Sequence, residues 1–276
     1  EHFVDRLMRA FSEARDWPQL VHIATDGETY GHHHRHGDMA LAYALDYIES
    51  NNLARLTNYG EYLHRHPPTV EVDIIENTSW SCAHGLGRWS RNCGCRSGQH
   101  PEWNQTWRVP LRQALNWLRD TVGTPFEELG RQYLKDPWAA RNEYIEVVLD
   151  RSAQSVERFL RCQASRELDE AEKITALKLL ELQRHAMLMY TSCGWFFDDL
   201  AGIETLQVIH YAGPVLQLAQ ELFGSNLEPH FLYLLSRAKS NLVAQGDGRD
   251  LFERVVRPAM ITLPAVSGHY ALSSLF

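Results

Sequence analysis

The residues best suited to chemistry lie together near the start of the chain, in residues 20–36. Two carboxylates, Asp26 and Glu28, follow the apolar run 20–24. Four histidines come directly after them: His32, His33, His34 and His36. Carboxylates beside imidazoles can act as acid/base catalysts, as metal ligands or as hydrogen-bonding groups for a hydroxyl-rich ligand. We interpret this segment as a candidate site, because a polar loop that only caps the next helix needs a single such residue.

A second group of chemically capable residues lies in residues 76–98, which show neither helical nor strand periodicity. Long loops of this kind are usually functional, and Trp80 can offer an aromatic face, so the leading interpretation is a substrate loop. The alternative is a structural zinc site, with Cys82, His84, Cys93 and Cys95 as ligands. Their C-x-H and C-x-C spacings are closer than the common C-x₂-C, and we expect that closeness to strain a tetrahedral site.

The elements around these residues alternate in type. Short apolar runs predict strands at residues 20–24, 53–57 and 70–75. Apolar residues at helical spacing predict helices at residues 2–14, 39–50 and 60–65. Alternating helices and strands are typical of a parallel sheet or barrel, whose loops converge at the carboxyl ends of the strands.

The character of the sequence changes near residue 100. Helical periodicity dominates from there on, and the longest predicted helices cover residues 139–162, 170–190, 203–222 and 229–243. We therefore predict two domains, an α/β part over residues 1–100 and a helical bundle over residues 101–276. Residues 187–199 interrupt the helices, so Trp195 and the neighbouring aspartates are either displayed at a helix terminus or buried in the core.

Composition excludes several classes of protein. The net charge of −8 argues against a nucleic-acid-binding protein, which needs a basic face. No apolar run is long enough to span a membrane and no signal peptide is recognisable, so we expect a cytoplasmic protein. Five cysteines, an odd number, do not resemble a secreted disulfide framework. The chain begins with Glu1 rather than Met, which favours the later part of a longer protein.

Several segments resemble glycoside hydrolase family 57, whose members act on α-glucans. Residues 26–32, DGETYGH, are similar to the family motif D-x-E-x-F-G-H. Residues 66–68 and 76–80 resemble a proline pair followed by a Ser-Trp loop, and residues 187–197 resemble a helical segment that usually reads Ser-Asp-Trp. Because the three matches occur in the family order, the chain resembles the C-terminal part of a family-57-like protein of an uncharacterised branch.

The resemblance implies the C-terminal part of a (β/α)₇ barrel followed by a helical bundle, acting on α-linked glucans with retention and without a cofactor. Asp26 matches the general acid/base, and Glu28 would bind substrate or support Asp26. The remaining candidates for substrate binding are His32, His33, Trp80, His84 and Trp195. Retaining enzymes also need a nucleophilic carboxylate. The family's nucleophile is a Glu on an earlier strand, so we expect it in an upstream barrel portion of the parent protein.

Two other functions remain open at this point. One is a metal-dependent hydrolase or metal-binding protein. Its ligands would come either from residues 76–98, called the cysteine loop below, or from Asp26 with His32, His34 and His36. The other is a non-catalytic carbohydrate-binding module. The expected partners are an oligosaccharide or polysaccharide and the upstream barrel portion, with no nucleic acid and no membrane.

Overall fold

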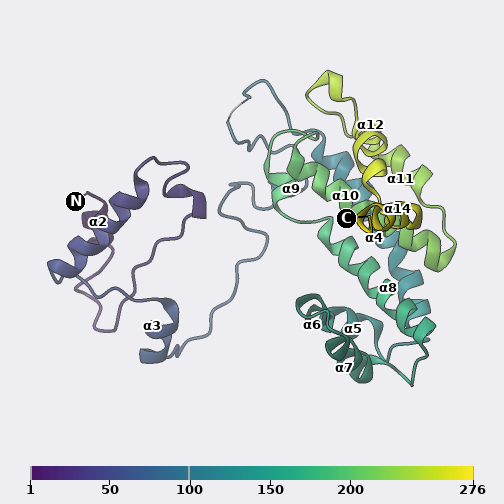
Figure 1. Ribbon diagram of the computed structural model, residues 1–276. Coiled ribbons are helices and arrows are strands. Elements are labelled where there is room, and N and C mark those ends of the chain that lie inside the picture. The colour runs from purple at the N-terminus through teal and green to yellow at the C-terminus, as the bar shows by residue number, and fades with distance from the viewer. Residues whose placement is uncertain (1, 99, 276) are drawn as a thin grey trace. The chain divides into compact units, whose positions relative to one another are not determined.

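The computed structural model describes residues 2–98 and 100–275, and it is mostly helical (Figure 1). Contacts divide the chain into two compact units, Glu1–Ile75 and Glu76–Phe276. The cysteine loop therefore belongs to the same unit as the helices that follow it. Glu1, one of the few carboxylates that precede the Asp26 motif, lies outside the described residues.

The first unit contains three α-helices: α1 (His2–Met8), α2 (Gly37–Ser50) and α3 (Tyr59–Arg65). Its core is small, and its buried apolar residues are Val4, Ala44 and Ile48. The helix expected at 39–50 is confirmed as α2, and the one expected at 60–65 as α3. Asn58 caps α3 by accepting a hydrogen bond from the Glu61 backbone N–H at 2.9 Å.

The strands predicted in this unit were wrong. Residues 20–24, 53–57 and 70–75 contain no strand in the described structure, so no sheet or partial barrel forms there. A strand requires hydrogen bonds to a neighbouring strand, and an apolar run by itself supplies only the side chains. Val70, Val72 and Ile74 show the consequence, because they are 77%, 86% and 88% exposed.

The helical bundle expected in the second half is confirmed. Its largest core lies among α4 (Arg108–Gly130), α8 (Glu170–Leu188), α10 (Ile203–Phe223) and α11 (Glu228–Leu235). Helix α4 contributes a stripe at helical spacing, with Leu111, Leu115 and Leu118 all 0% exposed. Figure 1 draws α4 in teal, α8 in green and α11 in yellow-green, with the colour following the chain.

A second core forms where α5 (Pro137–Glu143), α6 (Ile145–Leu149) and α7 (Ala153–Gln163) pack against α8. The sequence predicted a single helix over 139–162. The break occurs because the Asp150 carboxylate accepts the Ser152 backbone N–H at 2.9 Å and Ser152 then caps α7. The remaining helical segments are α9 (Cys193–Phe196), α12 (Gly248–Leu251), α13 (Arg257–Ala259), α14 (Leu263–Ser273) and a π-helical stretch, η4 (Phe252–Val256).

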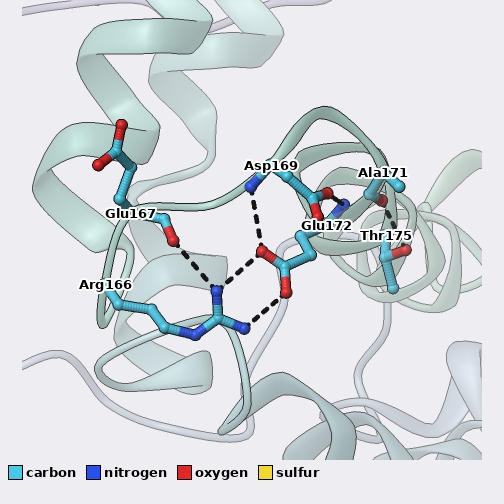
Figure 2. Close-up of polar contacts among 6 residues, drawn as sticks. All are labelled: Arg166, Glu167, Asp169, Ala171, Glu172 and Thr175. Carbon is cyan, nitrogen blue, oxygen red and sulfur yellow. Dashed lines mark hydrogen bonds and ion pairs between the residues drawn. The ribbon is translucent and has the colours of Figure 1, made fainter.

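A reciprocal cap fixes the start of α8, as Figure 2 shows. The Asp169 carboxylate accepts the Glu172 backbone N–H at 2.9 Å, and the Glu172 carboxylate accepts the Asp169 backbone N–H at 3.0 Å. The Arg166 guanidinium donates to both Glu172 oxygens, at 2.7 and 2.8 Å. This arrangement satisfies backbone donors that a helix start leaves unpaired.

Candidate metal centre

The cysteine loop brings its four metal-ligating side chains to one point. Cys82 and His84 precede the short 3₁₀ turn η2 (Gly87–Trp89), and Cys93 and Cys95 follow it. Each pair is two residues apart, and the backbone turns at residues 83–85 and at Gly94 rather than running extended. Gly85 and Gly94 have φ angles of +68° and +79°, a conformation that glycine adopts without strain. A Cβ at Gly85 would also lie 2.4 Å from the Asn77 carbonyl oxygen.

The ligand atoms of these four residues all lie within 4.8 Å of one another. The Sγ of Cys82 is 3.6 Å from that of Cys95 and 3.9 Å from that of Cys93. The Nδ1 of His84 is 3.5 Å from Cys95 Sγ and 4.0 Å from Cys82 Sγ. The cysteines are free thiols, because a disulfide needs sulfurs about 2.05 Å apart.

These separations match the edges of a tetrahedral zinc site. Zinc bonds of about 2.3 Å to sulfur and 2.0–2.1 Å to nitrogen place two sulfurs about 3.8 Å apart and a sulfur and a nitrogen about 3.6 Å apart. Despite the close C-x-H and C-x-C spacings, the four ligand atoms converge, with positive-φ glycines at Gly85 and Gly94 beside the two pairs. The cluster could therefore hold a metal ion.

The surroundings of Cys82 favour its charged form. Burial raises the pKa of this thiol, but hydrogen bonds from the backbone N–H groups of His84 and Arg88 outweigh burial and lower the pKa to about 6. Burial and the neighbouring Cys82 thiol raise the pKa of Cys95. A thiolate at Cys82 near neutral pH suits metal binding, because the thiolate is the ligand form.

Two buried arginines accompany the cluster: Arg108, whose guanidinium reaches the Cys93 thiol, and Arg88, whose backbone N–H donates to Cys82. Arg108 is 0% exposed, and its Nη1 is 4.0 Å from Cys93 Sγ and 3.3 Å from the Cys95 carbonyl oxygen. Burial lowers the pKa of Arg108 to about 10, and the repulsion of Arg88 contributes. Arg88 is 5% exposed and lies over the Phe196 ring at 4.1 Å. The Nε atoms of both arginines are buried without a hydrogen-bond partner.

Further hydrogen bonds fix the loop to the helices of the same unit. The Asp198 carboxylate accepts the Ser97 backbone N–H at 2.9 and 3.0 Å and also its hydroxyl. The Trp89 indole donates to the Ser192 carbonyl oxygen at 3.1 Å, and the Trp89 carbonyl oxygen accepts from Arg112 at 3.0 Å. The cluster is thus held at the start of α4 and beside α9.

The predicted substrate-binding residues of this unit differ sharply in exposure. Trp80 is 86% exposed, so its ring is free to meet a ligand. His84 is exposed but its Nδ1 lies in the cysteine cluster. Trp195 is 0% exposed and packs 6.5 Å from the Trp107 ring, which makes it a core residue with no face for a sugar. The neighbouring aspartates, Asp198 and Asp199, are buried and hydrogen-bonded, which decides their role in favour of the core.

The other predicted residues share one exposed loop in the first unit. Asp26 directly precedes the short turn η1 (Gly27–Thr29), and Glu28 lies within it. The backbone N–H of His33 donates to the Glu28 carbonyl oxygen at 3.0 Å, which folds the histidines back onto the turn, and the His32 and His33 rings lie 5.0 Å apart. Over the described residues, the carboxylates and histidines of this loop form no group with metal-site spacing.

Sequence reasoning missed the two buried arginines. A signal was present at Arg108, which falls in register with the apolar residues Leu111 and Leu115 of the α4 stripe. A charged residue in register with a buried stripe must find a partner of opposite charge or polar groups. For Arg88, which lies inside an irregular loop, the sequence holds no comparable signal.

In the parts of the chain that the structure covers, no helix is both long enough and apolar enough to cross a membrane.

Comparisons with known proteins add one family. Searches of curated proteins and of solved structures find no match to the chain. The model of one family matches residues 103–276, which begin shortly after the cysteine loop and include Arg108 and the whole helical bundle. Since that match spans more than half of the chain, the protein belongs to the family described as a domain of unknown function, DUF3536.

Proposed function

We propose that the chain binds one zinc ion through Cys82, His84, Cys93 and Cys95, and that this ion has a structural role. The observation that carries the proposal is the convergence of all four ligand atoms within 4.8 Å, with the distances from Cys82 Sγ to Cys93 and Cys95 and from His84 to Cys95 within about 0.2 Å of the edges of a zinc tetrahedron. Thiolate and imidazole ligands are those that zinc prefers. With four protein ligands no coordination position is left for substrate, which is typical of structural sites.

The ion would hold the two ends of the loop together. Cys82 and His84 lie before the η2 turn, and Cys93 and Cys95 lie after it, so a shared metal closes the segment into a ring. An ion that binds the folded loop and not the unfolded chain stabilises the folded state. Binding to the folded state alone adds about 4 kcal/mol of stability when free metal exceeds the dissociation constant a thousandfold.

Metal analysis of protein purified without a histidine tag tests this role. We expect one zinc per chain, a fall in melting temperature on chelation, and loss of both in Cys95→Ser. Cys162→Ser is the matched control, because Cys162 is an exposed thiol on α7, outside the cluster. Full-length protein that neither holds zinc after purification nor takes it up would overturn the proposal.

We also propose that the protein acts on α-glucans in the manner of glycoside hydrolase family 57, with Asp26 as general acid/base. Support comes from the DGETYGH motif at residues 26–32 and from the order of the three matching segments. The exposure of Asp26, Glu28 and the adjacent histidines on one folded loop is compatible with substrate binding. The nucleophile, and the barrel to which residues 1–100 would contribute, would come from the rest of the parent protein.

In that mechanism protonated Asp26 donates its proton to the leaving glycosidic oxygen, and its carboxylate then activates a water molecule or a sugar hydroxyl. Glu28, His32 and His33 would bind sugar hydroxyls. The test is product analysis of the complete protein with maltooligosaccharides and glycogen. Asp26→Asn should abolish products, whereas Asp46→Asn, an exposed aspartate on α2, should not. Full activity of Asp26→Asn would refute the assignment, and oligosaccharide binding without products would favour a binding module.

A further inference from the structure

The charge around the cysteine cluster is unusual for a protein interior. Arg108 and Arg88 are both buried, and neither forms an ion pair with a carboxylate among the described residues. The carboxylate that acts on Arg108 is Asp198, which is itself hydrogen-bonded to Ser97. Buried charge is costly unless it is balanced, and beyond Asp198 the groups that act on Arg108 with negative charge are the thiolates of Cys93 and Cys95.

The proposed metal complex would keep all three cysteines in the thiolate form beside these arginines. A divalent ion held by three thiolates and a neutral imidazole carries one net negative charge. That charge and the Asp198 carboxylate together balance the two guanidinium groups. The geometry agrees, because Arg108 Nη1 is directed at both the Cys93 sulfur, at 4.0 Å, and the Cys95 carbonyl oxygen, at 3.3 Å.

Arg108 also connects the cysteine cluster to the helices that the family model matches, in residues 103–276. It is the first residue of α4, and its Nη2 donates to the Phe197 carbonyl oxygen at 3.1 Å, directly after α9. A single side chain thus joins the cysteine loop, the start of α4 and the end of α9. A planar guanidinium is suited to such a bridge, because its donors point in several fixed directions.

We propose that Arg108 is the positioning and charge-balancing residue of the zinc centre, so that metal affinity depends on its charge and the metal stabilises the α4–α9 junction through it. This inference rests on the zinc site proposed above. Partners that orient metal ligands usually contribute about 10- to 100-fold to affinity when they are removed. A purely structural arginine would instead stabilise the protein equally with and without metal.

The test uses the full chain and Zn²⁺ in competition with a chromogenic chelator. Arg108→Met should weaken zinc binding about 10- to 100-fold, and Arg108→Lys, which keeps the charge, should recover part of the loss. Arg119→Met is the control, because Arg119 lies further along α4 and pairs with the exposed Asp120 instead of bonding to the cysteine loop. Its zinc affinity should equal that of the unmodified protein.

Two further measurements separate the outcomes. The rise in melting temperature on adding Zn²⁺ should be smaller in Arg108→Met than in the unmodified chain, and the Co²⁺-loaded variant should show weaker sulfur-to-cobalt charge-transfer absorption. Unchanged zinc affinity in Arg108→Met, with equal destabilisation of the metal-free and metal-loaded forms, would overturn this inference and leave the zinc site intact. No zinc binding by the unmodified chain would instead refute the proposed function.

Discussion

At the scale of single residues, Gly194 occupies a position that only glycine fits: residues 193–195 read Cys-Gly-Trp where the similar family segment usually reads Ser-Asp-Trp. A Cβ at Gly194 would lie 2.0 Å from the Val208 Cγ2 and 2.9 Å from the Glu204 carbonyl oxygen. Only glycine therefore lets α9 approach α10 so closely, and an aspartate does not fit. The sequence predicted that residues 187–199 interrupt the helices, but it could not indicate this contact, because Val208 is distant in the chain.

Gly194→Ala should accordingly lower the free energy of unfolding by about 1–3 kcal/mol, the usual cost of overpacking. Gly123→Ala is the control, because Gly123 lies inside α4 and a Cβ there would meet nothing within 4 Å. That substitution should stabilise the protein by about 0.5–1 kcal/mol, since glycine is a poor helix former. Urea unfolding of both variants measures the difference, and equal stability of the two would contradict the packing argument.

At the scale of elements, the helices were predictable and the strands were not, and the reason is physical. The backbone hydrogen bonds of α8 and α10 join residues four apart in the chain, so a helix needs no distant partner. The apolar spacing of each segment is therefore enough to indicate it. A strand at residues 70–75 depends on a partner strand that its own sequence does not specify. Helix ends are predictable only in part. The Asp169 cap at the start of α8 is a local sequence pattern. The break at residues 150–152 instead depends on a side-chain hydrogen bond that competes with the helix.

The cap of α8 should make stability depend on pH in a defined range. Hydrogen bonds from Arg166 and from the Asp169 backbone lower the pKa of Glu172 to about 2, from an ordinary value of 4.5. A lowered carboxylate pKa stabilises the fold above the unfolded value and loses that effect as the pH falls through the folded value. The melting temperature of Glu172→Gln should therefore lie below that of the unmodified chain at pH 7 and pH 5, and the gap should close between about pH 4.5 and pH 2.

A matched control comes from Glu170, which lies in the same helical turn but is not part of the cap, and whose side chain pairs with Lys173. Glu170→Gln should show no comparable closing of the gap between pH 4.5 and pH 2. A gap for Glu172→Gln that stays constant down to pH 2 would mean that the Arg166 contact does not persist in solution.

At the scale of the whole molecule, composition and periodicity predicted the helical bundle, and residue types singled out both candidate sites. The four ligands were recognised as a set because their types are characteristic of zinc, but their convergence depends on the backbone turns at Gly85 and Gly94. The role of Arg108 depends on burial, which a single sequence shows only as a charged residue in an apolar stripe. The loop around Asp26 was recognised from its carboxylates and histidines and from the DGETYGH motif.

The two units should also differ in how readily they open. The core of the first unit contains three buried apolar residues, Val4, Ala44 and Ile48, whereas α10 lies in the large core of the second unit. Because opening free energy follows buried apolar contact, backbone amides of α2 should exchange with deuterium far faster than those of α10. Hydrogen exchange followed by mass spectrometry measures both helices in one sample. Equal protection of α2 and α10 would show that the first unit is stabilised by contacts beyond its own small core.

Chelation should speed exchange in residues 82–95 and leave α10 unchanged, because the proposed ion closes only that loop.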